Sequence, residues 1–306
     1  MARIIDELLT NFKKENVVGK FIYVNVAVYL VLAVVTVVAT LFALNIPVEH
    51  FVRFFELPAS LQQLLYQPWS LVSYMFLHGG LTHILWNMIA LYYFGKIFMQ
   101  FYSTRHFVGL YLFGGIMGGI FYIAAYNLLP YFSGEAGGAY LVGASAAVLA
   151  VVVAAAIRNP SYRINLFLFG TMRLITVALI TVAASFLLTT SSNAGGNIAH
   201  LGGAFAGWAF AYMLNKGYDL TKWINAVIDF FSNFSAGNLK FKFKRKPKMR
   251  VNTTRSAKHS ADYEYNARKK AEQDNIDIIL DKVKKSGYSS LSDDEKRRLF
   301  DASNRN

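Results

Sequence analysis

Apolar residues in this chain gather in six runs that contain few charges. The runs cover residues 21–44, 80–102, 107–129, 142–157, 164–190 and 197–215. A helix needs about 20 mostly apolar residues to cross the hydrocarbon core of a bilayer. The pattern therefore predicts an all-α polytopic membrane protein with six transmembrane helices. The fourth run is short and rich in alanine, so we expect its helix to be enclosed by the others and not to face lipid.

Basic residues are distributed unevenly between the connections. Arg105 lies between the second and third runs, Arg158 and Arg163 lie between the fourth and fifth, and a basic excess follows the sixth, whereas the alternate connections contain only Arg53. Cytoplasmic connections carry the excess of Lys and Arg in membrane proteins. Both termini are therefore predicted to be cytoplasmic, in a plasma (inner) membrane that the chain crosses several times.

The composition divides the chain into three parts. Residues 1–20 form a predicted cytoplasmic N-terminal segment, residues 21–215 the six-helix core, and residues 216–306 a basic cytoplasmic tail. The 306 residues are 55% hydrophobic and 16% charged, and the net charge is +13. The tail alone holds 21 of the 31 Lys and Arg residues. Because the basic excess belongs mainly to a tail, we expect no nucleic-acid partner. The chain has no cysteine, which excludes disulfides and Cys-ligated zinc.

Two features of the tail predict how it behaves. Seven basic residues between Lys240 and Arg250 favour anionic lipid at the membrane surface, at about 1 kcal/mol per charge. An apolar stripe predicts a helix over 263–286, and Ser292 followed by Glu295 fits a capping box that opens a second helix ending near Ser303. The expected product is a small soluble helical appendage, either a docking or regulatory element or a passive tail.

Four polar residues lie at similar depth in the predicted membrane core. His83 and Asn87 fall about three and seven residues into the second run, and Ser145 and His200 each fall about three residues into the fourth and sixth. Even-numbered helices all start on the external side if both termini are cytoplasmic. These positions then lie roughly 5 to 10 Å below that surface. Each residue alone is also compatible with a helix-packing role, and only the set favours a site.

Small residues surround the serine and follow the second histidine. Gly143 and alanines flank Ser145, while Gly203 and Gly207 share a helix face with His200. Small residues at this spacing let two helix backbones approach closely. A serine hydroxyl and an imidazole on such neighbours come within hydrogen-bond reach, which is what a serine nucleophile and its general base require.

With these motifs, the sequence resembles the rhomboid family of intramembrane serine proteases. The family's HxxxN motif on the second helix is matched by HILWN at 83–87, its GxSx motif on the fourth by GASA at 143–146, and its histidine followed by glycines on the sixth by AHLGG at 199–203. The resemblance covers about residues 20–215 and includes the long first loop. It implies a rhomboid-like bundle of six transmembrane helices.

The resemblance also implies an activity and its residues. Ser145 is the expected nucleophile and His200 the general base, acting as a dyad. His83, Asn87 and the backbone N–H of Ser145 are the expected oxyanion hole. The implied reaction is hydrolysis of a peptide bond in a transmembrane protein near the outer bilayer edge, with no cofactor and no metal.

Two positions depart from the family pattern. Ala146 stands where the family most often has glycine, and Leu149 stands where many members have an aromatic residue that packs on the imidazole. The methyl group of Ala146 is expected either to crowd the substrate or to alter the backbone amide of Ser145. These departures keep a second reading open: a catalytically inactive rhomboid-like protein that binds transmembrane helices. The sequence leaves the physiological substrate, the cleavage site, the oligomeric state and the role of the appendage open.

Overall fold

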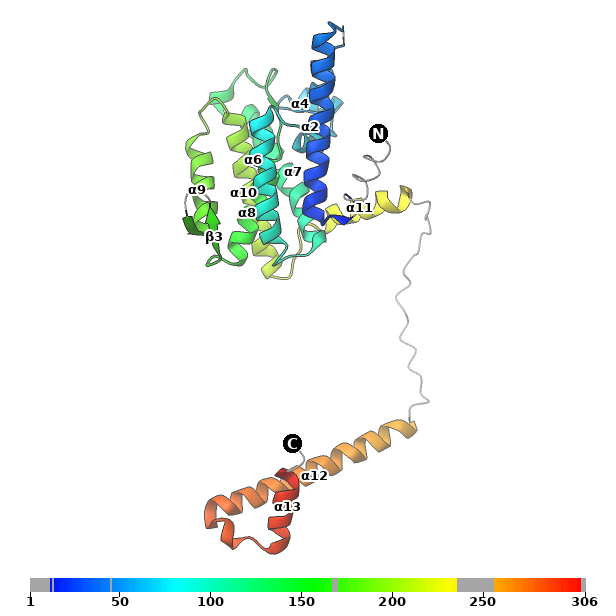
Figure 1. Cartoon of the computed structure of the whole chain (residues 1–306), viewed down its shortest axis with the longest axis vertical. Coiled ribbons are helices and arrows are strands. Elements are labelled where there is room, and N and C mark those ends of the chain that lie inside the picture. The colour runs from blue at the N-terminus through cyan, green and yellow to red at the C-terminus, as the bar shows by residue number, and fades with distance from the viewer. Residues whose placement is uncertain (1–11, 13, 45, 167–169, 236–255, 304–306) are drawn as a thin grey trace. The chain divides into compact units, whose positions relative to one another are not determined.

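The structure is a computed structural model that describes residues 12, 14–44, 46–166, 170–235 and 256–303. The chain divides into two compact units, residues 1–239 and 240–306 (Figure 1). The basic cluster predicted between Lys240 and Arg250 and most of the predicted N-terminal segment lie outside the described residues. Each unit is mostly helical.

Six helices of the first unit correspond to the six apolar runs. They are α2 (Val17–Leu41), α6 (Leu81–Phe98), α7 (Thr104–Leu128), α8 (Ser145–Arg158), α9 (Leu174–Leu187) and α10 (Ala194–Asn215). Figure 1 shows α2, α6, α8, α9 and α10 side by side with their axes roughly aligned. The predicted helix order is therefore present.

The prediction that the fifth helix begins at the start of the fifth run, near residue 164, is wrong. Two antiparallel strands, β3 (Arg163–Leu166) and β4 (Gly170–Arg173), pair in this part of the run, and α9 begins only after them. Gly170 has a φ of +68°, in the left-handed region that favours glycine. The pairing places Arg163 opposite Arg173, so both charges lie on one connection.

Among the described helices, α2 and α7 are long and apolar enough to cross a membrane by length and hydropathy. Two of the other four, α8 and α9, have only 14 residues each. The remaining two have the length but contain polar residues and glycines that lower their mean hydropathy, including His83, Asn87 and Lys96 in α6 and Asn197 and His200 in α10. The site residues themselves thus weaken the hydropathy signal.

The first long loop is a series of short elements packed on the bundle. It contains α3 (Val48–Arg53), β1 (Leu57–Pro58), α4 (Leu61–Tyr66), α5 (Ser70–Ser73) and a 3-10 turn, η1 (Tyr74–Phe76). A second 3-10 turn, η2 (Pro130–Phe132), follows α7, and β2 (Tyr140–Leu141) pairs antiparallel with β1. The loop is thereby joined to the segment that leads directly into α8.

Helix α8 lies at the centre of the first unit. Every residue from Ala146 to Ala156 is buried, which confirms that the short fourth helix is enclosed. Glycines permit this packing: Gly203 and Gly207 of α10 face the backbone carbonyls of Ala146 and Ala150. On the other side, Gly114 and Gly118 of α7 face the methyl groups of the same two alanines. The backbones of α7, α8 and α10 therefore approach as the small-residue spacing predicts.

One helix after the predicted core boundary at residue 215 was not anticipated. Helix α11 (Lys222–Ser235) packs against α7 within the first unit.

The second unit is a helical hairpin. Helix α12 (Ser256–Ser286) begins seven residues before the predicted start, and a 3-10 turn, η3 (Tyr288–Ser290), leads to α13 (Asp293–Ser303). The predicted capping box is confirmed, since the backbone N–H of Ser292 donates to the Glu295 carboxylate at 2.7 Å and that of Glu295 to the Ser292 hydroxyl at 3.3 Å. Lys282 of α12 also donates to Glu295 at 2.8 Å. These donors lower the pKa of the Glu295 carboxyl.

We expect Gly203→Ala to lower the thermal unfolding temperature of the protein in detergent. The added methyl group would lie against the Ala146 backbone, which cannot move as a side-chain tip can. Overpacking of this kind costs about 1–3 kcal/mol. Gly138→Ala is the matched control, because a Cβ there meets nothing within 4 Å. Equal unfolding temperatures for the two variants would show that the backbones of α8 and α10 are not in close contact.

Candidate active site

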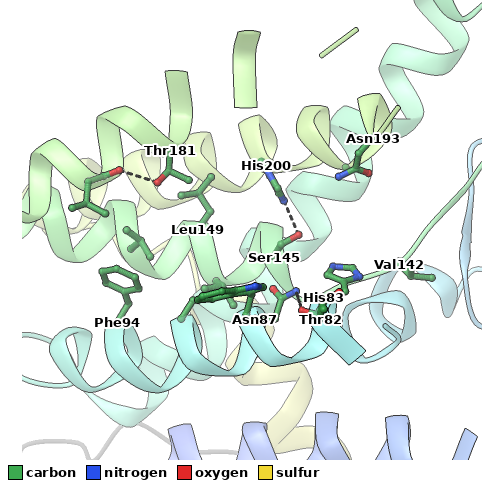
Figure 2. A pocket seen from close by; sticks show the side chains of 16 residues that line it. Thr82, His83, Asn87, Phe94, Val142, Ser145, Leu149, Thr181, Asn193 and His200 are labelled. Atoms are coloured by element: carbon green, nitrogen blue, oxygen red, sulfur yellow. Dashed lines mark hydrogen bonds between the residues drawn. The ribbon is translucent and has the colours of Figure 1, made fainter. Parts of the chain in front are cut away.

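The side chains of Ser145 and His200 face one another across the α8–α10 contact (Figure 2). The Ser145 hydroxyl oxygen lies 2.7 Å from Nε2 of His200. Ser145 is the first residue of α8, and His200 is the seventh residue of α10. The two residues thus occupy different positions along their helices, and the close packing of α8 against α10 brings their side chains together.

A second serine contacts the far side of the same imidazole. The hydroxyl of Ser185 in α9 lies 3.2 Å from Nδ1 of His200. Ser185 is only 4% exposed, so this hydroxyl has no ready access to water. Both ring nitrogens of His200 therefore have a serine partner, which fixes the plane of the ring.

The segment before α8 requires glycine at residue 143 for two reasons. Gly143 has a φ of +125°, and a Cβ there would lie 2.8 Å from Nε2 of His83 and 3.8 Å from the Ser145 hydroxyl oxygen. The backbone N–H of Gly143 donates to the Tyr74 carbonyl at 3.0 Å, and the Tyr74 hydroxyl donates to the Gly115 carbonyl at 2.7 Å. Because residue 143 has no Cβ, the His83 ring and the Ser145 hydroxyl border the same small space beside the Gly143 backbone.

Asn87 lies one turn beyond His83 on α6. Its Nδ2 donates to the His83 carbonyl at 2.9 Å, and because an amide nitrogen carries two N–H groups, one donor remains. His78, between η1 and α6, packs edge-on against the His83 ring at 5.2 Å. Burial, and secondarily the His83 ring, lowers the pKa of His78 to about 4, so His78 is neutral at physiological pH.

All four residues expected at the site line a single cavity of about 480 Å³. Ser145, His200, His83 and Asn87 lie at one end of it, with Asn193, which immediately precedes α10, nearby (Figure 2). The cavity continues between α6 and α9, where its walls are largely apolar and include Trp86, Ala90, Phe94, Val152, Val177 and Thr181. A polar end thus continues into an apolar groove.

The two departures from the family pattern occupy different environments. Ala146 is 1% exposed, does not line the cavity, and directs its methyl group toward Gly118 of α7. The expectation that this methyl group crowds the substrate is therefore wrong, because the group points into a helix interface. Leu149, one turn after Ser145, does line the cavity.

Sequence reasoning missed Ser185 and Tyr74. Ser185 carries a weak signal, because it is a polar residue inside the apolar fifth run, but that run also contains Thr176 and Thr181. Nothing in the spacing distinguishes the three. Tyr74 lies in the first loop, where no periodicity relates it to the serine segment. Only packing reveals either contact.

Part of this chain is similar in sequence to known proteins. Residues 66–217 match the rhomboid domain family. Over 144 residues the chain is 28% identical to the mitochondrial RHOMBOID-like protein 12 of Arabidopsis thaliana, covering 44% of this chain and 43% of that protein. It is 30% identical over 146 residues to the rhomboid protease GluP of Bacillus subtilis (strain 168), covering 48% and 26% of the two chains. Rhomboid-related protein 2 of Mus musculus is 24% identical over 162 residues, with 51% of each chain covered.

The fold and these matches define a membrane protein with a rhomboid domain. The chain belongs to the rhomboid family. The matched segments span about a quarter to a half of the relatives' lengths. Residues 259–305, a range that includes most of the helical hairpin of the second unit, match a separate family of unknown function, DUF6576.

We expect Ala146→Gly to destabilise the protein by about 1–2 kcal/mol, because it leaves a small void against α7 and places glycine inside a helix. Thermal unfolding in detergent measures this. Ala183→Gly, at an exposed position in α9, carries only the helix cost and is the control. An unchanged unfolding temperature, together with altered labelling of Ser145 by a serine-directed covalent probe, would place the methyl group in the cavity instead.

Proposed function

We propose that this protein is an intramembrane serine endopeptidase that hydrolyses a peptide bond in other membrane proteins. The observation that supports it most is the 2.7 Å contact between the Ser145 hydroxyl and Nε2 of His200 in a cavity that His83 and Asn87 also line. A nucleophile needs an adjacent base, and this pair supplies both.

In this proposal, residues 21–215 form the membrane core and the helices α2, α6, α7, α8, α9 and α10 are its six spans. The outward face of α2 supports it, because Leu30, Val31 and Val34 are each more than half exposed. A helix of 14 residues is about 21 Å long, shorter than the roughly 30 Å hydrocarbon core. Enclosure by its neighbours removes the need for α8 to match that thickness.

Both termini of the core face the cytoplasm in this proposal. In this topology, the connections that hold Arg105, Arg163 and Arg173 all face the cytoplasm, and so does the chain that follows α10. The opposite side then holds the entrance to α8 and the first loop. The cleaved bond lies near the outer edge of the bilayer, in a plasma (inner) membrane, and the tail after residue 216 meets anionic cytoplasmic lipid.

The chemistry follows from the donors around Ser145. His200 takes the hydroxyl proton at Nε2 as the oxygen of Ser145 attacks the carbonyl carbon, and then gives that proton to the leaving amine. Water, activated by the same imidazole, hydrolyses the acyl-enzyme. The His83 ring, the Asn87 amide and the backbone N–H of Ser145 stabilise the oxyanion. The loss of one such donor typically slows a reaction about 100- to 1000-fold.

Ser185 is the proposed positioning residue for His200. When Nδ1–H donates to the Ser185 hydroxyl, Nε2 is unprotonated and able to accept the Ser145 proton. A hydroxyl can accept the Nδ1 proton without adding a buried charge. A carboxylate in this place would be costly to bury in the membrane.

The apolar groove between α6 and α9 is the proposed path for a substrate. A transmembrane segment lying there meets Trp86 and Phe94 on one side and Val177 on the other. Leu149 lines the cavity one turn from the serine. Substrates are thus transmembrane proteins, and the groove favours apolar residues near the cleaved bond.

We predict that Ser145→Ala, His200→Ala and the double variant have nearly the same residual activity. Coupled catalytic groups lose their function together, so their effects do not multiply. The measurement is cleavage of a fluorogenic transmembrane substrate by the full chain in detergent. Asn193→Ala, at a cavity position outside the proposed chemistry, is the control for folding and binding.

Multiplicative losses in the double variant would mean that the serine and histidine act separately. Correct folding without cleavage, and without labelling of Ser145 by a serine-directed probe, would favour the inactive rhomboid-like protein that binds transmembrane helices.

Ser185→Ala is expected to lower kcat by roughly 2- to 12-fold with little change in KM, the equivalent of one hydrogen bond of about 0.5–1.5 kcal/mol. Ser185→Thr retains the hydroxyl and should restore most of the rate. The kcat and KM of both variants are measured with the same substrate. If Ser185→Thr is as impaired as Ser185→Ala, the hydroxyl does not orient His200.

A further inference from the structure

Helix α11 is firmly attached to the end of the bundle at which α7 begins. Ile224 is 4% exposed, and Nδ2 of Asn225 donates to the Arg105 carbonyl at 3.2 Å. Thr221, which precedes the helix, is fully buried against Gly109, where a Cβ would approach its side chain within 3 Å. One face of α11 is therefore packed on α7.

One ion pair and one histidine–carboxylate contact hold the same interface at its margins. Arg105 lies 3.3 Å from the Asp229 carboxylate, and His106 lies 3.6 Å from Asp219. The Arg105–Asp229 pair is exposed and such pairs contribute little, so packing supplies most of the attachment. Together the contacts fix which side of α11 faces outward.

The outward side carries four large apolar residues. Trp223, Val227, Phe230 and Phe231 are 53%, 48%, 58% and 63% exposed. Their spacing of three and four residues places them on one stripe of the helix, which we call the α11 stripe. Two phenylalanines, a tryptophan and a valine in a row are an unusual surface to leave in water.

Three observations indicate what covers the α11 stripe. Figure 1 shows α11, in yellow, lying across the end of the bundle where α2 begins, so the helix runs roughly parallel to the plane of the membrane in the proposed topology. The outward face of α2, the helix beside whose start α11 lies, is also apolar. Residues 240–250, which follow it in the sequence, contain seven basic residues and no acidic one, and such segments attract anionic headgroups.

We propose that α11 is an in-plane anchor whose α11 stripe inserts into the lipid leaflet on the side where α7 begins. An amphipathic helix of this kind lies roughly 5–10 Å deep, at the boundary of headgroups and acyl chains, where tryptophan is favoured. The proposal rests on the six-helix membrane core of the proposed function. Because α11 contacts α7, and α7 packs against α8 at Gly118, the anchor sets the depth of the helices that carry the site.

The absence of cysteine from the chain allows a direct test. Single cysteines are introduced into the full-length protein by Trp223→Cys, Val227→Cys and Phe230→Cys in the α11 stripe, and by Lys222→Cys and Ser232→Cys at exposed positions away from it. Each variant is labelled with an environment-sensitive fluorophore and reconstituted into vesicles of phosphatidylcholine and phosphatidylglycerol. Quenching is compared for brominated lipid and for aqueous iodide. Val31→Cys on α2 is the reference for a lipid-facing position.

The expected result is quenching by brominated lipid that is several-fold stronger at the stripe positions than at the two controls, with iodide showing the reverse order. Strong iodide quenching at the stripe would overturn the proposal, and weak quenching by both agents would also overturn it, because protein would then cover the stripe. If the label at residue 31 is quenched by lipid while the stripe is not, the membrane core stands and the anchor fails. If the label at residue 31 is quenched by iodide and not by lipid, the proposed membrane core fails.

Discussion

The close approach of α8 to its two neighbours is the constraint on which the rest of the structure depends. Gly203 and Gly207 of α10 face the carbonyls of Ala146 and Ala150, while Gly118 of α7 faces the Ala146 methyl group. No side chain larger than a methyl group separates these backbones. The short distance between the Ser145 hydroxyl and the His200 ring follows from this approach, since each residue is held by a buried part of its own helix. A larger residue at any of these glycines would move the Ser145 hydroxyl and the His200 ring apart.

A second constraint acts on the segment that precedes α8. The backbone of Gly143 adopts a conformation that most residues avoid, and the absence of a Cβ leaves room for the His83 ring. Tyr74 holds this segment from the first loop through a backbone hydrogen bond. The start of α8 is therefore positioned by contacts from η1 and α6 as well as by its own helix. The long first loop thus supports the site through packing.

The surroundings of His200 show how a buried base is oriented without a carboxylate. Ser145 and Ser185 occupy its two ring nitrogens, and they come from α8 and α9 on opposite sides of the ring. Neither partner adds a charge, so no buried ion needs to be solvated or neutralised. His78 likewise adds no buried charge, because burial lowers its pKa and keeps the imidazole neutral beside His83. The polar end of the cavity is thus built from neutral hydrogen-bonding groups.

The sequence by itself determined the six helical segments, the enclosed alanine-rich helix, the capping box at Ser292, and the four polar residues that line one cavity. These features follow from hydrophobic periodicity, small-residue spacing and local hydrogen bonding, which nearby residues control. Only the tertiary structure decided that β3 pairs with β4 before α9 begins, that Ser185 and not Thr181 reaches His200, that the Ala146 methyl group faces α7, and that α11 packs on α7 with its apolar stripe outward. Each of these depends on which neighbour a side chain meets, and that is set by packing between segments far apart in the chain.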